Sequence, residues 1–180
     1  MPIYKIKVNN SHDLNSLRAI RKHTDSILRI DANASWDFEH AINILPELEA
    51  MNIELIEQPL AKENYAQTKI LAQATTIPII ADESCVSPED LIQCIGTFDG
   101  INIKLTKCGG ITPAFEMIQE AKKNNLKVMI GNMNETEMST YATAQFLPLL
   151  DYVDMDGPLL LKIPELKRLQ YENATIHLIN

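Results

Sequence analysis

Three carboxylates recur at nearly even intervals along this 180-residue chain, and each one closes a short apolar run. Asp31, Glu57 and Asp82 end the runs, and intervals of about 25 residues hold one strand, one helix and two connections. Carboxylates that end neighbouring parallel strands meet at one edge of a sheet. All-oxygen ligation suits Mg²⁺ or Mn²⁺ better than zinc. The spacing therefore predicts a metal site, although an acid at a strand end can also cap the helix that follows.

Lysines flank the three carboxylates along the chain. Lys7 precedes the first carboxylate and Lys104 follows the last one at similar intervals. Lys5 and Lys7 share one face of a strand, where each cation would lower the pKa of the other and make one a useful base. A pair of solvated lysines on an exposed strand is the alternative. Lys7 and Lys104 would face each other across the metal, an arrangement suited to removing a proton from a carbon acid and returning it from the other side. Lys107 is expected to point outward into solvent.

The elements that must position these residues alternate between strands and helices. Several strand-like runs are nearly continuous Ile, Leu and Val, as in parallel strands covered on both faces. The predicted strands are 3–8, 27–33, 53–58, 77–82, 100–105, 127–131 and 152–155. A (β/α) TIM-type barrel has eight strands, so seven predict an incomplete α/β barrel, with an open seven-stranded sheet as the alternative. No linker interrupts the pattern, so residues 1–180 form one predicted domain, with 158–180 as its tail.

Several helix starts carry sequence signals. Residues 87–90 combine an N-cap serine, a first-turn proline and an acid three residues after the cap. Thr112, followed by proline, predicts a second start of the same kind. Asn64 and Asn134 are the predicted N-caps of two further helices.

The overall composition excludes some classes of function. A net charge of −8 argues against nucleic acid or an anionic membrane as the main partner. No apolar run approaches the roughly 20 residues of a membrane span, and 46% hydrophobic residues suffice for a buried core. The three cysteines match no zinc-ligand spacing and are typical of reduced thiols in a cytoplasmic protein.

The strand-end motifs together resemble the enolase superfamily, and within it the muconate lactonizing enzyme subgroup. In chain order they are Lys5-Ile6-Lys7, Asp31-Ala32-Asn33, Glu57-Gln58-Pro59, Asp82-Glu83-Ser84 and Lys104-Leu105-Thr106-Lys107-Cys108-Gly109-Gly110. The resemblance implies that Lys7 and Lys104 are the two acid/base lysines and that Lys5 supports Lys7. It also implies that the three carboxylates bind Mg²⁺, with Mn²⁺ as a substitute, and that the cation stabilises an enolate.

The substrate class depends on Asp154 and Asp156, which precede a Gly-Pro pair. Two acids separated by one residue share a strand face and can hold an ammonium group. With this acidic pair, the chain resembles dipeptide epimerases of the L-Ala-D/L-Glu type. It also assigns Glu135 and Asn33 to substrate binding. Muconate or chloromuconate cycloisomerase and o-succinylbenzoate synthase reactions remain alternatives on this scaffold. Further alternatives are a Schiff-base lyase using Lys104 and a metal-binding remnant without activity.

The chain departs from the family in several respects. An amino-terminal capping domain and a first barrel βα unit are expected to be absent, and Ala34 stands where glycine is common. An open strand edge favours pairing, so association is expected, either with a missing amino-terminal part or with another copy. The expected ligand is a small-molecule carboxylate or dipeptide.

Overall fold

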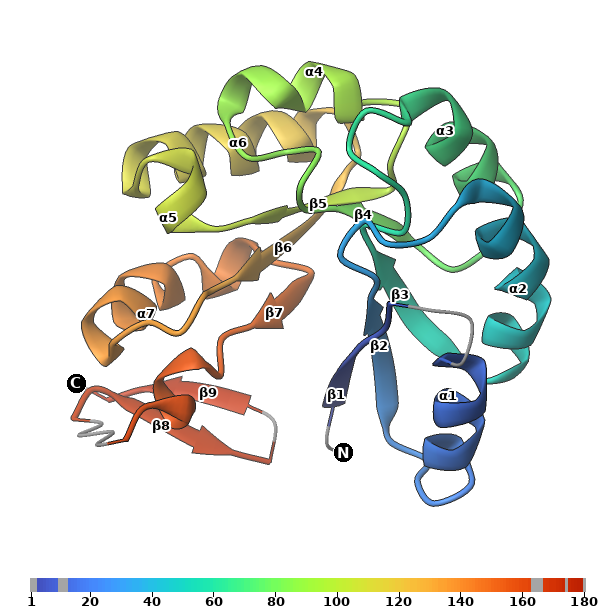
Figure 1. Ribbon diagram of the computed structural model, residues 1–180. Helices are drawn as coiled ribbons and strands as arrows, with labels where there is room; N and C mark the ends of the chain where they lie inside the picture. Colours follow the sequence, from blue (N-terminus) through green and yellow to red (C-terminus); the bar gives the residue numbers. More distant parts are fainter. Residues whose placement is uncertain (1–2, 10–12, 163–166, 174, 180) are drawn as a thin grey trace.

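Seven parallel strands form one sheet whose spatial order is the order of the chain (Figure 1). The computed structural model describes residues 3–9, 13–162, 167–173 and 175–179. The strands are β1 (Ile3–Lys7), β2 (Ile27–Asp31), β3 (Ile53–Glu57), β4 (Ile79–Ala81), β5 (Gly100–Ile103), β6 (Lys127–Gly131) and β7 (Tyr152–Asp154). Each strand pairs in parallel only with its neighbours in sequence. All seven predicted strands are confirmed.

Helices connect successive strands and lie on the outer, convex side of the curved sheet (Figure 1). The α-helices are α1 (Asp13–Arg21), α2 (Phe38–Ala50), α3 (Tyr65–Gln73), α4 (Leu91–Cys94), α5 (Leu105–Cys108), α6 (Ile111–Lys123) and α7 (Glu137–Ala144). The 3₁₀-helices are η1 (Pro88–Asp90), η2 (Leu147–Leu149) and η3 (Gly157–Leu160). This strand–helix alternation in a nearly closed sheet confirms the predicted TIM-barrel class.

Alternating residues of the strands pack into two separate hydrophobic cores, one on each face of the sheet. The larger core lies between sheet and helices and includes buried residues such as Ile30, Ile56 and Ile101. A second cluster of Leu55, Ile80 and Met129 packs on the other face of the sheet, with Tyr152 against it. Because side chains alternate across a strand, the residues two positions further along share this inner face. The strands therefore present their last polar residues above a small apolar floor.

The predicted helix starts are partly confirmed. Ser87 and Asp90 form the expected reciprocal capping box at η1, and Asn64 occupies the N-cap of α3 without a side-chain capping bond. Helix α6 begins at Ile111, one residue before Thr112. The prediction for Asn134 is wrong, since the N-cap of α7 is Thr136.

A β-hairpin follows the sheet, in a region that the sequence predicted only as a tail. Strands β8 (Leu169–Glu172) and β9 (Thr175–Leu178) pair antiparallel. The hairpin packs beside β7, where the Tyr171 hydroxyl donates a 2.7 Å hydrogen bond to the Met155 carbonyl. This contact fixes the hairpin next to the last strand of the sheet.

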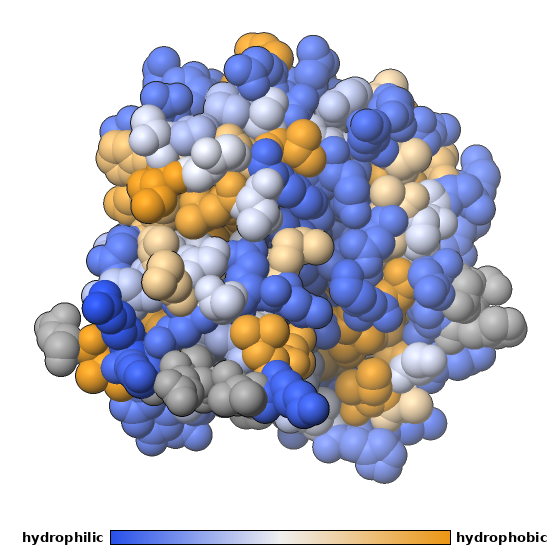
Figure 2. Space-filling model, turned by 60° about the vertical axis from the view of Figure 1, so that its left-hand side comes forward, coloured by the Kyte–Doolittle hydropathy of each residue, from blue (hydrophilic) through white to orange (hydrophobic). Residues whose placement is uncertain are grey.

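The surface is mixed in character. Figure 2, which turns the left-hand side of Figure 1 forward, shows hydrophilic side chains over most of this face with smaller hydrophobic groups between them. Single exposed apolar groups are ordinary on folded proteins. Among the described residues, no helix is both long and apolar enough to cross a lipid bilayer.

Candidate functional site

The predicted strand-end residues line up along one end of the sheet. Lys7 is the register partner of Asp31, and Asp31 is the partner of Glu57. Asp82 comes directly after β4, and Lys104 directly after β5. The parallel pairing of neighbouring strands therefore brings these five side chains together at the carboxyl end of the sheet, as the sequence spacing predicted. This end of the sheet is called the mouth below.

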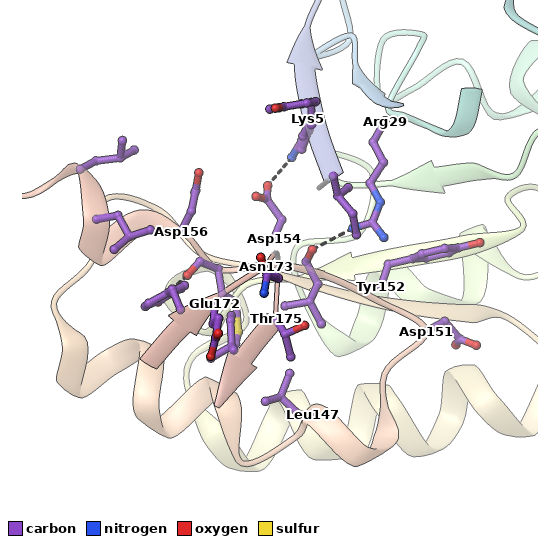
Figure 3. A pocket seen from close by; sticks show the side chains of 18 of the residues that line it. Lys5, Arg29, Leu147, Asp151, Tyr152, Asp154, Asp156, Glu172, Asn173 and Thr175 are labelled. Atoms are coloured by element: carbon purple, nitrogen blue, oxygen red, sulfur yellow. Dashed lines mark hydrogen bonds and ion pairs between the residues drawn. The ribbon is translucent and has the colours of Figure 1, made fainter. Parts of the chain in front are cut away.

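Lys5 joins three acids from three strands. Its Nζ lies 3.1 Å from Asp31 Oδ2, 2.7 Å from Glu57 Oε2 and 2.7 Å from Asp154 Oδ2. Figure 3 shows Lys5 and Asp154 pointing toward each other across the space between β1 and β7. These two strands are the edges of the sheet, so a side-chain ion pair bridges edges that share no backbone pairing.

Lys7 occupies a more open position beside the first carboxylate. Its Nζ donates to Asp31 Oδ2 at 3.1 Å and to Asn33 Oδ1 at 2.6 Å, and its side chain is 70% exposed. Asn33 also donates its backbone N–H to Asp31 Oδ1 at 3.1 Å. Ala34 adopts φ 59°, a left-handed conformation that glycine adopts without steric cost. This explains why glycine suits the position.

Lys104 and Lys107 share the last carboxylate. Lys104 Nζ lies 2.8 Å from Asp82 Oδ2, and Lys107 Nζ lies 2.8 Å from Asp82 Oδ1. The prediction that Lys107 points into solvent is wrong, because its side chain is only 26% exposed and reaches inward. Lys107 lies three residues after Lys104, the N-cap of α5, a spacing at which two side chains of a helical turn share one face.

Glu57 is the most deeply buried of the three acids, with no exposed surface. Asn102, also fully buried, donates its amide to Glu57 Oε1 at 2.7 Å. Oε2 lies 2.7 Å from Lys5 Nζ, but the angles do not make a hydrogen bond, so this oxygen keeps an unused lone pair. A buried anionic oxygen of this kind, beside two further carboxylates, fits a hard divalent cation. The donor chemistry therefore suits Mg²⁺ or Mn²⁺.

Two lysine ammonium groups lie among the three carboxylates. In the described part of the chain, no three acidic, histidine or cysteine side chains already surround one point as a metal site. The ammonium group of Lys5 lies between Asp31 and Glu57, and that of Lys104 lies against Asp82. Metal binding would require these ammonium groups to move aside.

The neighbouring carboxylates raise the pKa values of both buried lysines, Lys5 and Lys104. Burial works against the charge on Lys5, but Glu57, Asp154 and Asp31 outweigh it and raise the Lys5 pKa. The pKa of Lys104 is raised in the same way, because Asp82 outweighs burial. For Lys5 the direction is opposite to the sequence expectation, which considered the paired lysines without the acids around them. Each ammonium is therefore held in its charged form by its carboxylates.

The carboxylates respond to burial and to one another. Burial raises the pKa of Glu57, Lys5 acts against that rise, and Asp31 and Asp82 add to it. Burial would also raise the pKa of Asp31, but Lys5 and Lys7 outweigh it and hold the pKa below its ordinary value. Glu57 is thus the acid whose negative charge is least well compensated.

The predicted substrate residues lie in two places. Asp154 ends β7 with its carboxylate on Lys5, and Asp156 follows at the start of η3. Both line a cavity of about 920 Å³ between β1, β7 and the hairpin (Figure 3). Burial, followed by the charge of Asp154, raises the pKa of Asp156. Glu135 lies in the loop after β6, where its carboxylate accepts hydrogen bonds from Met133 N and Ser139 Oγ. It is not among the residues that line this cavity.

Arg29 is a buried residue of this region that sequence reasoning missed. Its Nε donates to Glu54 Oε2 at 2.6 Å and its Nη1 donates to the Val153 carbonyl at 2.8 Å. Its guanidinium also lies 5.2 Å from the centre of the Tyr152 ring. Arg29 lies two residues before Asp31, so strand alternation alone could have placed it on the inner face.

Comparison with known proteins identifies the family. The family described as Enolase C-terminal domain-like matches residues 1–176. The chain belongs to this family. It is 47% identical over 160 residues to an L-Ala-D/L-amino acid epimerase from Flavobacterium johnsoniae, which covers 89% of the chain and 48% of that relative.

Solved structures of family members show the same fold. The substrate-liganded L-Ala-D/L-Glu epimerase from Bacillus subtilis matches with TM-score 0.91 and 33% identity, over 98% of this chain and 53% of that chain. The dipeptide epimerase from Cytophaga hutchinsonii, complexed with Mg and the dipeptide D-Ala-L-Val, matches with TM-score 0.87 and 34% identity, over 97% and 50% of the two chains. The chain spans about half the length of the curated relatives it matches.

Proposed function

We propose that this chain carries the metal and proton-transfer site of a Mg²⁺-dependent dipeptide epimerase. The observation that carries the proposal is the arrangement of two lysines at opposite ends of a row of three carboxylates. Lys7 contacts Asp31 at one end, and Lys104 contacts Asp82 at the other. Relatives named as dipeptide epimerases, one of them solved with Mg and a dipeptide, support the same function.

In this proposal each side chain has a defined task. Asp31, Glu57 and Asp82 would hold the cation, which would supply stabilisation of the negative charge that develops on the substrate carboxylate. Lys7 and Lys104 approach the neighbouring carbon from opposite faces, so one removes its proton and the other returns a proton from the other side. The lysine that removes the proton must be in its neutral form, and the other lysine must carry the proton that it returns.

The acids after β7 select the substrate. Asp154 already accepts the ammonium group of Lys5 at 2.7 Å, which supports a role in receiving the α-ammonium group of a dipeptide. Asp156 lies two residues further on and lines the same cavity. Asn33 contacts Lys7 beside the first carboxylate and could orient the substrate there. Glu135 is proposed to bind substrate only by resemblance to the family.

The metal site is tested first by calorimetry. Mg²⁺ is titrated into the chain and into an Asp31→Ala/Asp82→Ala double variant, with a Glu120→Ala variant as control, since Glu120 is an exposed acid outside the mouth. We expect saturable binding to the chain and to the control, and none to the double variant. Failure of the unaltered chain to bind Mg²⁺ would refute the metal proposal.

The reaction is tested by hydrogen exchange in deuterated water. L-Ala-L-Glu is incubated with the chain and Mg²⁺, and α-deuterium is followed by NMR. N-Acetyl-L-Ala-L-Glu, which lacks the ammonium group, is the matched control. We expect exchange of the free dipeptide only, and its loss in an Asp154→Asn variant. Equal exchange of both compounds would refute the role of Asp154, and no exchange of either would refute epimerase activity for this chain.

We further propose that the edges of β1 and β7 take up an additional strand. Among the contacts described, the side chain of Lys5 on β1 reaches Asp154 of β7, and Arg29 of the neighbouring strand β2 reaches the Val153 carbonyl of β7. The cavity of about 920 Å³ lies between the two edges. The strand would come from a second copy or from the kind of polypeptide that makes up the other half of the relatives. Sedimentation equilibrium over a range of concentrations tests the second copy, which a monomer at every concentration would refute.

We propose a cytoplasmic location as well. Cys85, Cys94 and Cys108 are all unpaired and buried, which supports a reducing compartment. Fractionation of cells that produce the tagged chain tests this, and recovery outside the cytoplasm would contradict it.

A further inference from the structure

Lys107 contacts the site in a way that none of the proposed catalytic roles explains. It lies on α5, the single helical turn that starts directly after Lys104. Its ammonium group reaches Asp82 Oδ1 at 2.8 Å, and its side chain is 26% exposed. The exposed lysines Lys62 and Lys123 keep 63% and 75% of their side-chain surface. Lys107 is therefore folded inward toward one acceptor.

The backbone ends α5 immediately after Lys107 and Cys108. Gly109 at the C-cap has φ 96°, and Gly110 has φ 121°. Two successive residues in this region turn the chain sharply, and glycine adopts the conformation without steric cost. The helix stops after Cys108, so Lys104 and Lys107 stay three residues apart on one turn and face the same carboxylate.

The two lysines hold Asp82 by both of its oxygens. Lys104 takes Oδ2 and Lys107 takes Oδ1, each at 2.8 Å. The backbone N–H of Asp82 is fixed as well, because it donates to Gln58 Oε1 at 3.0 Å. A carboxylate bound through one oxygen can rotate about its Cβ–Cγ bond, whereas one bound through both oxygens cannot do so without breaking a contact.

We propose that Lys107 is a positioning residue that fixes the orientation of the Asp82 carboxylate. It touches no reacting atom in the proposed mechanism and acts only through Asp82. Its consequence for metal binding rests on the proposed function, in which Asp82 is a ligand. Partners that orient a ligand in this way change metal affinity by about 10- to 100-fold when they are removed.

The variants separate orientation from general effects of charge or length. Lys107→Met removes the ammonium group and keeps a long side chain, and Lys107→Arg keeps a cation that reaches Asp82. Lys62→Met is the control, since the Lys62 side chain is 63% exposed and its ammonium group lies 3.8 Å from Glu63, which is not one of the three carboxylates. Thermal unfolding establishes which variants are folded. Lys107→Gln, which keeps a donor without the charge, replaces Lys107→Met if that variant does not fold.

The first readout is a crystal structure of each variant without added metal. We expect the Asp82 carboxylate to rotate, or to occupy two conformers, in Lys107→Met and to keep one orientation in Lys107→Arg. An Asp82 that superimposes on that of the unaltered chain in Lys107→Met would overturn the proposal. This result does not depend on metal binding, so it separates a failure of the inference from a failure of the proposed function.

The second readout is the Mg²⁺ dissociation constant by calorimetry. We expect a 10- to 100-fold weaker constant for Lys107→Met and constants close to that of the unaltered chain for Lys107→Arg and Lys62→Met. Equal or tighter binding by Lys107→Met would mean that the Lys107 charge only competes with the metal, and would overturn the positioning role. Absence of binding by the unaltered chain would refute the metal proposal and leave the crystallographic test of Lys107 decisive.

Discussion

Replacing Arg29 by methionine should test whether side chains hold the two edges of the sheet together. Arg29 lies on β2, is 6% exposed, and donates to the Val153 carbonyl of β7 at 2.8 Å. It also pairs with Glu54 at 2.6 Å and lies over the Tyr152 ring. Methionine keeps most of the apolar stem and removes only the guanidinium group.

The expected cost follows from the contacts that are lost. Hydrogen bonds to a charged group contribute about 1.5–3 kcal/mol, and a cation–π contact about 0.5–2 kcal/mol. Glu54 keeps 31% of its side-chain surface exposed, so water partly replaces its lost partner. We therefore expect the free energy of unfolding to fall by about 2–4 kcal/mol.

Urea unfolding followed by circular dichroism measures this change. The midpoint should fall while the slope stays constant, because the surface exposed on unfolding is nearly the same. Arg18→Met is the matched control: Arg18 forms a two-contact pair with Glu47 at the surface and keeps 50% of its side-chain surface exposed. Such a solvent-exposed pair contributes little to stability, so Arg18→Met should lower the midpoint far less than Arg29→Met. Equal losses in the two variants, or a loss below about 0.5 kcal/mol for Arg29→Met, would refute the reasoning.

Two further changes probe the mouth and the hairpin. In Gly131→Ala the new Cβ would lie 3.0 Å from Asn102 Oδ1, so urea unfolding should show a loss of about 1–3 kcal/mol. Asn102→Ala alone loses the hydrogen bond to Glu57, so it is the reference: Gly131→Ala should cost less in that background than in the unaltered chain, and an equal cost would contradict the steric explanation. Tyr171→Phe removes the hydrogen bond to Met155 and should cost about 1 kcal/mol at neutral pH. Burial, followed by Asp156, raises the Tyr171 pKa from 10.0 to about 12. The difference in free energy of unfolding between the unaltered chain and Tyr171→Phe should therefore be complete below pH 10 and disappear as the pH rises through about 12. A difference that does not change with pH would contradict this.

The sequence predicted the row of site residues because the strands are parallel and lie in the sheet in the order in which they occur in the chain. Residues at regular intervals along the chain therefore lie side by side at one end of the sheet. Asp31 and Glu57 became register partners for that reason. The directions of the lysine side chains needed more information. Lys107 was assigned to solvent because its neighbours in sequence do not show that Asp82, 25 positions away, lies within reach of its ammonium group.

Other features were missed because their partners are distant in sequence. Arg29 and Val153 are 124 positions apart, and no periodic pattern links them. The N-cap at Thr136 was misassigned to Asn134 because the two candidates lie close together, and only the extended backbone of Thr136, with ψ 164°, distinguishes them. The raised pKa of Lys5 depends on three acids from three strands meeting one ammonium group, which is a property of the fold.

The contact between Lys5 and Asp154, which are 149 positions apart, has a consequence for the order of events during synthesis. From β2 to β7, each strand of the sheet pairs with the strand made just before it, so the sheet can grow one unit at a time as the chain leaves the ribosome. Contacts between sequence-distant residues form late, since the intervening chain must first be ordered. Until β7 emerges, Lys5 has Asp31 and Glu57 as partners and lacks Asp154. A nascent chain stopped after β6 would therefore contain the carboxylate row and most of the outer core, but not the complete site.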